Sequence, residues 1–250
     1  MLHLYQLNRV VMPDLHDAFG QVLLDYYKSG TVIPHIIERC DGYIDTDNAD
    51  FYFQPFDAWM DVEREAIGHA FGNILDVGAG AGRVSLYLQE KGLFVTALDN
   101  SPLAMEVCKL RGVNQTLCKP FMSLSKRDGI FDTLVLFGNN FGLFQSRHKM
   151  LDQLVKLNRI MPDNALIIAH VLDPYRTDLP EHLTYQRTNR DLCRMSGQVR
   201  IRIRYKTLKT PYFDYLFASQ EEILDIVKNS AWHVERFIGT DAQYCVLLRK

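Results

Sequence analysis

A glycine-rich turn between two short apolar runs constrains the fold of this chain more than any other feature. The runs are residues 74–77 and 94–98, and an amphipathic stretch that ends near Gly92 separates them. Apolar runs of this length are typical of buried parallel strands, and the stretch between them has the period of a helix. A helix that joins two parallel strands makes a right-handed crossover. The segment therefore predicts a β-α-β unit within an α/β fold.

The turn itself is open to a ligand, because the glycines at positions 78, 80 and 82 carry no Cβ atom. The helix that follows directs its N-terminal N–H groups and the positive end of its dipole at the same place. A dinucleotide-binding turn requires a glycine at position 83, which holds Arg83. Asp76 precedes the turn and would repel a pyrophosphate. Asp99 ends the second strand, where a carboxylate can accept hydrogen bonds from both hydroxyls of a ribose.

The order of Asp76, the G-x-G-x-G turn and Asp99 resembles motif I and the next acidic residue of class I S-adenosylmethionine-dependent methyltransferases. The resemblance covers residues 73–250 and implies a doubly wound, mostly parallel, seven-stranded sheet with an antiparallel C-terminal strand. It also implies that the chain binds S-adenosylmethionine and releases S-adenosylhomocysteine; a nicotinamide or flavin enzyme is the alternative. The residues expected to bind the cofactor are Asp76, Gly78, Ala79, Gly80, Gly82, Asp99, Asn100, Ser101, Phe121, Phe137 and Asn139.

The third predicted strand covers residues 114–118, and the loop that follows it departs from the family pattern. Many members place an acidic residue there, where it binds the amino group of adenine. This chain has Lys119-Pro120-Phe121 instead. We expect backbone groups and stacking on Phe121 to hold the base.

The acceptor side is expected to combine an N-terminal lid with the loop after the fourth strand. The resemblance implies that Asn139 in this loop holds the methionine amino group, although asparagine also simply favours turns. Neighbouring Asn140 is expected on the substrate side. Tyr43, Tyr52 and Trp59 are expected to cover the acceptor, unless these aromatic residues only pack the lid onto the core.

We predict one domain of residues 1–250, because no linker-like segment interrupts the chain. Apolar residues make up 47% and charged residues 23% of it, which is ordinary for a soluble globular protein. Its expected parts are an N-terminal helical lid (1–72), a cofactor-binding half (73–175), a substrate-side insertion with a sixth strand (176–212), and a C-terminal helix and hairpin (213–250). The lid helices are expected to begin at Pro13-Asp14 and at Asp57.

The predicted sixth strand, residues 198–208, alternates apolar and basic side chains. Its basic face consists of Arg200, Arg202, Arg204 and Lys206. A solvated edge strand is one interpretation of this face. Binding of an acidic substrate or a nucleic-acid backbone is the other.

The expected chemistry is an in-line displacement at a methyl group that the sulfonium already activates, so that alignment and desolvation supply much of the rate. A general base is needed only when the acceptor must lose a proton. His170, near the end of the fifth strand (165–172), is the first candidate and Tyr175 the second. A structural hydrogen-bonding role for His170 is the alternative. No spacing of histidine, cysteine or acidic residues predicts a metal site.

The leading hypothesis is a cytoplasmic methyltransferase that acts on a small molecule. The net charge of −2 argues against general attraction to nucleic acid or membranes, and five scattered cysteines indicate reduced thiols. A second hypothesis keeps the fold and the cofactor but takes RNA or protein as the acceptor through the basic strand. A third is a non-catalytic nucleoside-binding protein of the same fold.

Overall fold

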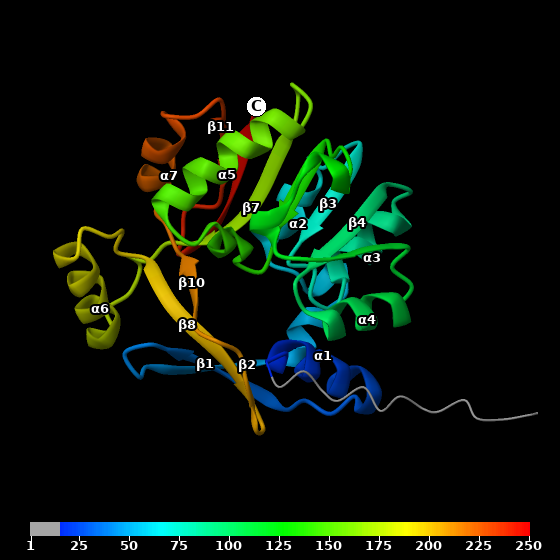
Figure 1. Ribbon diagram of the computed structural model, residues 1–250, viewed down its shortest axis with the longest axis horizontal. Helices are drawn as coiled ribbons and strands as arrows, with labels where there is room; N and C mark the ends of the chain where they lie inside the picture. Colours follow the sequence, from blue (N-terminus) through cyan, green and yellow to red (C-terminus); the bar gives the residue numbers. More distant parts are fainter. Residues whose placement is uncertain (1–15) are drawn as a thin grey trace, which may run out of the picture.

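A seven-stranded sheet forms the centre of the computed structural model, which describes residues 16–250 (Figure 1). Its strands lie in the order β11-β12-β7-β6-β3-β4-β5. They are β3 (Asn73–Val77), β4 (Phe94–Asp99), β5 (Gln115–Cys118), β6 (Thr133–Leu136), β7 (Leu166–Leu172), β11 (His233–Ile238) and β12 (Gln243–Arg249). β3 to β7 pair in parallel, whereas β12 runs antiparallel to both of its neighbours. The expected doubly wound, mostly parallel sheet with an antiparallel C-terminal strand is therefore confirmed.

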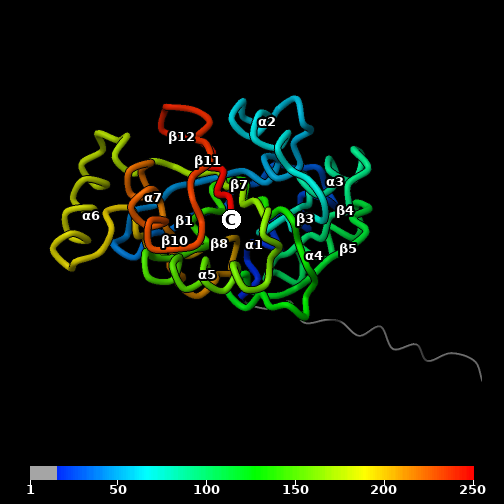
Figure 2. The backbone as a smooth tube through the Cα atoms, turned by 90° about the horizontal axis from the view of Figure 1, so that it is seen from above, coloured from blue at the N-terminus to red at the C-terminus, as the bar shows by residue number. Residues whose placement is uncertain are grey.

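Helices cover both faces of this sheet (Figure 2). The helices α2 (Asp61–Ile67) and α3 (Arg83–Glu90) pack on one face, and α5 (Arg147–Ile160) and α7 (Gln220–Val227) pack on the other. All four residues of β6 are buried, as its continuous apolar run predicts for a strand covered on both sides. Within residues 16–250, none of the helices combines the length and the apolar character needed to cross a bilayer.

Local capping residues set the starts of several helices. Ser101 caps α4 (Pro102–Leu110) by accepting a hydrogen bond from the backbone of Ala104, and Ser146 caps α5 in the same way. Ser219 and Glu222 form a capping box at α7.

A second sheet, in the order β10-β8-β1-β2, lies below the first in the view of Figure 1. Its strands are β1 (Pro34–Arg39), β2 (Ile44–Asn48), β8 (Gln198–Tyr205), β9 (Leu208–Lys209), which pairs only with β8, and β10 (Phe213–Leu216). The helices α1 (Ala18–Ser29) and α6 (Pro180–Asp191) and five short 3-10 turns complete the described chain: η1 (Ala49–Phe53), η2 (Phe56–Ala58), η3 (Phe121–Ser123), η4 (Lys126–Asp128) and η5 (Asn140–Phe144).

The second sheet corrects two expectations about the parts of the chain. The predicted sixth strand is β8, but it lies between β1 and β10 rather than at an edge of the main sheet. The lid is helical only in part, because residues 34–48 form an antiparallel hairpin that pairs with β8. Alternating polarity identifies a strand, but it does not identify the strand's partner, so the sequence pattern could not assign β8 to a sheet.

The lid helices also begin later than predicted. Asp17 caps α1 through a hydrogen bond from the backbone of Gly20, while Pro13 and Asp14 lie outside the described residues. The second lid helix, α2, begins at Asp61 rather than at Asp57. The helix α6 was not predicted, because its sequence is polar and has only weak periodicity.

Candidate functional site

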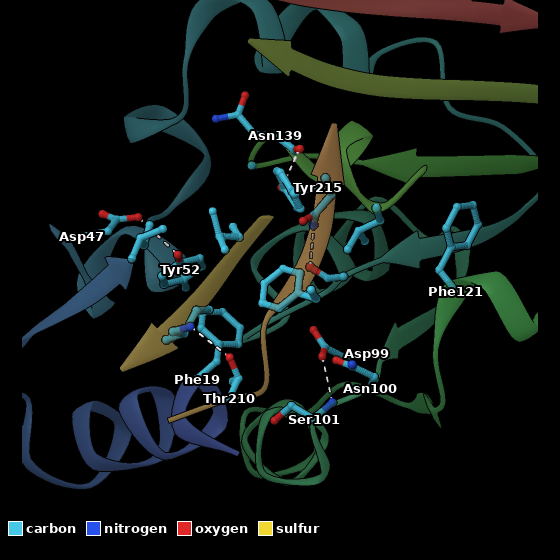
Figure 3. Close-up of a pocket in the computed structure, with 18 of the residues that line it drawn as sticks. Phe19, Asp47, Tyr52, Asp99, Asn100, Ser101, Phe121, Asn139, Thr210 and Tyr215 are labelled. Atoms are coloured by element: carbon cyan, nitrogen blue, oxygen red, sulfur yellow. Dashed lines mark hydrogen bonds between the residues drawn. The ribbon is translucent and has the colours of Figure 1, made fainter. Parts of the chain in front are cut away.

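A cavity of about 840 Å³ lies between the carboxyl ends of the central parallel strands and the second sheet (Figure 3). It opens where the strand order reverses between β3 and β6, which is the usual ligand position in open α/β sheets. Most of the predicted site residues line it: Asp76, Gly78, Ala79, Asp99, Asn100, Ser101, Phe121, Phe137, Asn139, Asn140, Tyr43 and Tyr52. Gly80, Gly82, Trp59, His170 and Tyr175 are not among the lining residues.

The carboxylate of Asp99 lies at the end of β4 and is held there by two backbone amides. Oδ2 accepts a hydrogen bond from Gly80 N at 3.1 Å, and Oδ1 accepts one from Ser101 N at 2.9 Å. Burial raises the pKa of Asp99, and these amides oppose that shift. Each carboxylate oxygen keeps a second lone pair that can accept a hydroxyl hydrogen bond from a ligand.

Asp76 supports the turn as well as lining the cavity. Its Oδ2 accepts hydrogen bonds from the backbone N (3.0 Å) and the hydroxyl (2.7 Å) of Ser85, in the first turn of α3. Burial raises the pKa of Asp76 to about 6. The carboxylate therefore stabilises the N-terminus of α3, a role that the sequence pattern did not reveal.

Hydrogen bonds from the side chain of Asn140 stabilise the glycine turn. Asn140 Nδ2 donates to the carbonyls of Val77 (3.0 Å) and Gly78 (2.9 Å), and a Cβ on Gly78 would lie 2.4 Å from this nitrogen. At Gly82, where φ is +79°, a Cβ would lie 2.9 Å from Val113 and 3.0 Å from Cys108, so this glycine permits packing against α4 and the turn after it instead of ligand approach.

Asn139 begins the loop on the other side of the crevice and has a left-handed φ of 63°, which asparagine tolerates. Its carbonyl accepts a hydrogen bond from the hydroxyl of Tyr215 on β10 at 2.6 Å, which ties this loop to the second sheet. The side-chain Oδ1 is buried and has no hydrogen-bond partner. An unsatisfied acceptor at the wall of a cavity suits a ligand that donates a hydrogen bond.

A buried ion pair between Glu63 and Arg83 lies next to this loop. Arg83 Nη2 lies 2.8 and 3.0 Å from the two carboxylate oxygens of Glu63, whose Oε1 also accepts a hydrogen bond from Gly138 N at 2.9 Å. The guanidinium is 4.7 Å from the ring centroid of Trp59, and its Nη1 has no partner. Arg83 lines the cavity, so Nη1 can donate to a ligand. No sequence pattern identifies Glu63 as the partner of Arg83, because the pairing forms only in the tertiary structure.

Comparison with known proteins places this geometry among methyltransferases. A sequence profile described as a methyltransferase domain matches residues 74–159. A candidate methyltransferase of Geobacillus sp. (strain WCH70) is 21% identical over 133 residues, which are 50% of this chain and 53% of the relative. The candidate methyltransferase YqeM of Bacillus subtilis is 22% identical over 129 residues, which are 49% and 51% of the two chains. The chain thus spans about half the length of the curated relatives that it matches.

The likeness to solved structures extends over nearly the whole chain. A SAM-dependent methyltransferase of Bacteroides fragilis, solved with S-adenosyl-L-homocysteine, has a TM-score of 0.80 at 25% identity, and the match covers 95% of this chain and 96% of that one. The profile match and this structural match support the class I S-adenosylmethionine-dependent methyltransferase family for this chain. A SAM-dependent methyltransferase of Methanosarcina mazei shares the fold, with a TM-score of 0.59 at 16% identity over 76% of this chain and 99% of its own.

The residues of this methyltransferase fit S-adenosylmethionine at the glycine end of the cavity. Asp99 can accept hydrogen bonds from the ribose hydroxyls. The unpartnered Oδ1 of Asn139 can accept one from the ammonium group, and the unpartnered Nη1 of Arg83 can donate one to the carboxylate. Phe121 is 5% exposed and lines the cavity from the loop after β5, where the base was expected.

Two predicted catalytic residues of this methyltransferase do not face the cavity. His170 is 1% exposed, and its Nδ1 lies 3.2 Å from Glu63 Oε1 and 3.2 Å from the backbone N of Asn139. It therefore supports the loop from behind, which corrects its prediction as a general base. Tyr175 is largely exposed, and its hydroxyl donates to Glu222 Oε1 at 2.8 Å, so the geometry does not support a catalytic role either.

Trp59 was expected on the substrate side but lies behind the cavity wall. It is buried, its ring centroid is 6.1 Å from that of Phe137, and its Nε1 donates to the carbonyl of Gln54. The ring packs the lid onto the core, as the alternative interpretation proposed. Tyr52 and Tyr43 do line the cavity, with Tyr43 lying between Arg39 and His182.

Proposed function

We propose that this protein transfers a methyl group from S-adenosylmethionine to a small molecule bound between the two sheets. The proposal rests on one observation, which is that a single cavity has two chemically different ends. One end has the glycine turn and Asp99, and the other has the inner face of the second sheet. A single continuous volume lets an acceptor lie directly against the cofactor.

The cofactor, when bound, supplies an electrophilic methyl group on a sulfonium. The chain supplies binding and orientation: Asp99 toward the ribose, Asn139 and Arg83 toward the amino-acid part, and Phe121 toward the base. Tyr52 and Phe19 lie over the glycine turn, where a Cβ on Gly80 would be 3.6 and 3.8 Å from their rings. These aromatic rings exclude water from the reacting end of the cavity.

The basic strand supports a small-molecule acceptor better than RNA or protein, because most of its charges are paired within the chain. Arg202 and Arg204 contact the two carboxylate oxygens of Glu38 at 2.6 and 2.8 Å. Lys206 contacts Asp25 at 2.6 Å. Paired charges attract a polyanion weakly, so we expect this strand to show no salt-dependent binding of nucleic acid.

Isothermal titration calorimetry tests the proposed cofactor. We expect micromolar binding of S-adenosylmethionine and S-adenosylhomocysteine and no binding of NADH. Asp99→Ala should abolish binding, because it removes the ribose acceptor and releases two backbone amides. Asp163→Ala is the matched control, since its side chain is fully exposed. Tight NADH binding, or unchanged cofactor affinity in Asp99→Ala, would contradict the proposal.

A further inference from the structure

The acceptor end of the cavity is mainly an apolar wall. β8 turns alternate side chains toward it, and β1 and β10 add further apolar groups from either side of β8. The apolar lining residues on these strands are Ile37, Val199, Ile201, Ile203 and Phe213. Such a wall suits a small and largely apolar acceptor.

Polar residues also lie on this wall: Arg39 on β1 and Asp214 on β10, which each make an ion pair, and His35 on β1. The side chain of His35 is 1% exposed, and neither Nδ1 nor Nε2 has a hydrogen-bond partner. Buried polar groups in proteins are nearly always hydrogen-bonded, and an unmade bond costs stability. A buried imidazole without a hydrogen-bond partner at a cavity wall indicates that a bound ligand supplies the missing hydrogen bond.

The imidazole lies where the two ends of the cavity meet. Its ring centroid is 6.2 Å from that of Phe19 and 6.1 Å from that of Tyr52. Both of these rings lie against the glycine turn, at ordinary contact distance from a Cβ on Gly80. Figure 3 shows Phe19 and Tyr52 across the cavity from Asp99. His35 is therefore close to the end at which the cofactor is proposed to bind.

Three other polar side chains that line the cavity, those of Tyr52, Tyr215 and His182, already have partners. The hydroxyl of Tyr52 donates to Asp47 Oδ2 at 3.2 Å, and that of Tyr215 donates to the Asn139 carbonyl. His182 Nδ1 lies 3.1 Å from the hydroxyl of Thr177.

The surroundings of His35 keep its ring able to accept a proton. Burial lowers the pKa of His35, while the charge and the backbone of Asp47, directly opposite on β2, act to raise it. Other titratable groups that line the cavity include Arg39 on β1, Asp45 on β2, Tyr52 on η1, His16 and Asp17 at the start of α1, and Asp214 and Tyr215 on β10. A neutral imidazole has one nitrogen free to accept, and a nearby carboxylate stabilises the imidazolium that forms.

Given the methyltransferase function proposed above, we propose that His35 binds the acceptor and receives its proton. The acceptor is then a small, largely apolar molecule with a hydroxyl or N–H group at the atom to be methylated. A bond forms between that oxygen or nitrogen and the methyl carbon. The C–S bond breaks, its electron pair stays on sulfur, and the proton moves to the unprotonated nitrogen of His35. His35 then releases this proton to solvent.

The test uses the full chain, S-adenosylmethionine with a labelled methyl group, and a panel of phenols, alcohols and aromatic N–H heterocycles. Their O-methyl and N-methyl counterparts serve as aprotic controls. Wild type and His35→Phe, His35→Gln and His148→Gln variants are compared, the last because the side chain of His148 is 87% exposed on α5. Calorimetry with S-adenosylhomocysteine measures folding and cofactor binding in each variant.

We expect every variant to bind S-adenosylhomocysteine within about twofold of wild type. In His35→Phe, kcat should fall by about 100-fold or more, as for loss of a general base, and its remaining rate should lose the acidic limb of the pH profile. In His35→Gln, the KM for the acceptor should lie closer to the wild-type value than it does in His35→Phe, while kcat should stay low. His148→Gln should match wild type.

Three outcomes would overturn the role of His35 while leaving cofactor binding intact. They are transfer in His35→Phe within threefold of wild type, transfer only to aprotic acceptors, and transfer to no member of the panel. Failure of the wild-type protein to bind either cofactor form would instead remove the proposed function on which this inference rests.

Discussion

At the scale of single residues, Glu63 connects more parts of the site than any motif residue. It contacts Arg83, His170 and the backbone of Gly138, and it is fully buried. Burial alone would raise the pKa of Glu63, but the hydrogen bond with His170 and the charge of Arg83 lower it to about 2.

We predict that Glu63→Gln destabilises the protein by about 3 kcal/mol at pH 7, because it leaves the buried guanidinium of Arg83 without a counter-charge. Since the folded-state pKa of Glu63 lies below its ordinary value of 4.5, this contribution is complete above about pH 4.5. It disappears as the pH falls toward 2. Urea unfolding of wild type and variant across this range measures the difference.

Glu65→Gln is the control on the same helix, because Glu65 makes an exposed ion pair with Arg236 and should change stability by no more than about 0.5 kcal/mol. If the difference in unfolding free energy between wild type and Glu63→Gln did not change with pH, the charge of Glu63 would not be the source of the stabilisation.

At the scale of elements, the carboxylate of Asp17 connects α1 to the start of α4. Asp17 caps α1 through Gly20 N, and its other oxygen accepts hydrogen bonds from the hydroxyl of Ser101 (2.8 Å) and from Leu103 N (3.1 Å) at the start of α4. The lid helix and the helix after Asp99 therefore share a cap.

We predict that Asp17→Ala lowers the free energy of unfolding by about 2 kcal/mol, at the upper end of the range for losing an N-cap. Hydrogen exchange should accelerate most in α1. A double-mutant cycle with Ser101→Ala should give a clear coupling energy, because the two side chains are in contact. Asp61→Ala, at an exposed helix start, is the control. Additive effects of Asp17→Ala and Ser101→Ala would exclude a shared cap.

At the scale of the whole molecule, the acceptor end exists only because strands distant in sequence form one sheet. β1 and β2 come from the lid, whereas β8 and β10 come from the segment after β7. Ala49 of the lid and Tyr205 of β8 share one hydrophobic cluster, and the two segments together form the wall opposite the glycine turn.

We predict that Ile201→Trp on β8 reduces methyl transfer at least tenfold while S-adenosylhomocysteine binding stays within about twofold. The larger side chain occupies the acceptor end, and β8 belongs to the second sheet, whereas the glycine turn follows β3 of the first. Labelled-methyl transfer and calorimetry measure the two effects. Val155→Trp, at an exposed position of α5, controls for the added indole. Equal loss of cofactor binding would show that the two ends are not separate.

Much of the cofactor half could be predicted because its features are local. The apolar runs of β3 and β4, the glycine turn and the caps at Ser101, Ser146 and Ser219 each depend on residues within a few positions of one another. Asp99 was predictable because it ends a strand whose carboxyl end must face the crevice.

The acceptor half could not be predicted in the same way. His170 stands at the end of β7, as a catalytic residue would, yet the nearby carboxylate of Glu63 holds it behind the loop. His35 had no motif around it, and only the absence of a partner in the folded protein distinguishes it.

By itself, the sequence determined the β-α-β unit, the order of elements along the chain and the chemistry of the glycine turn, because backbone geometry and hydrophobic period act over short distances. The tertiary structure decided which strands share a sheet and which buried charges meet, as with Glu38 and Arg202, which are 164 residues apart. Such contacts depend on the shape of the whole core, which no local pattern encodes.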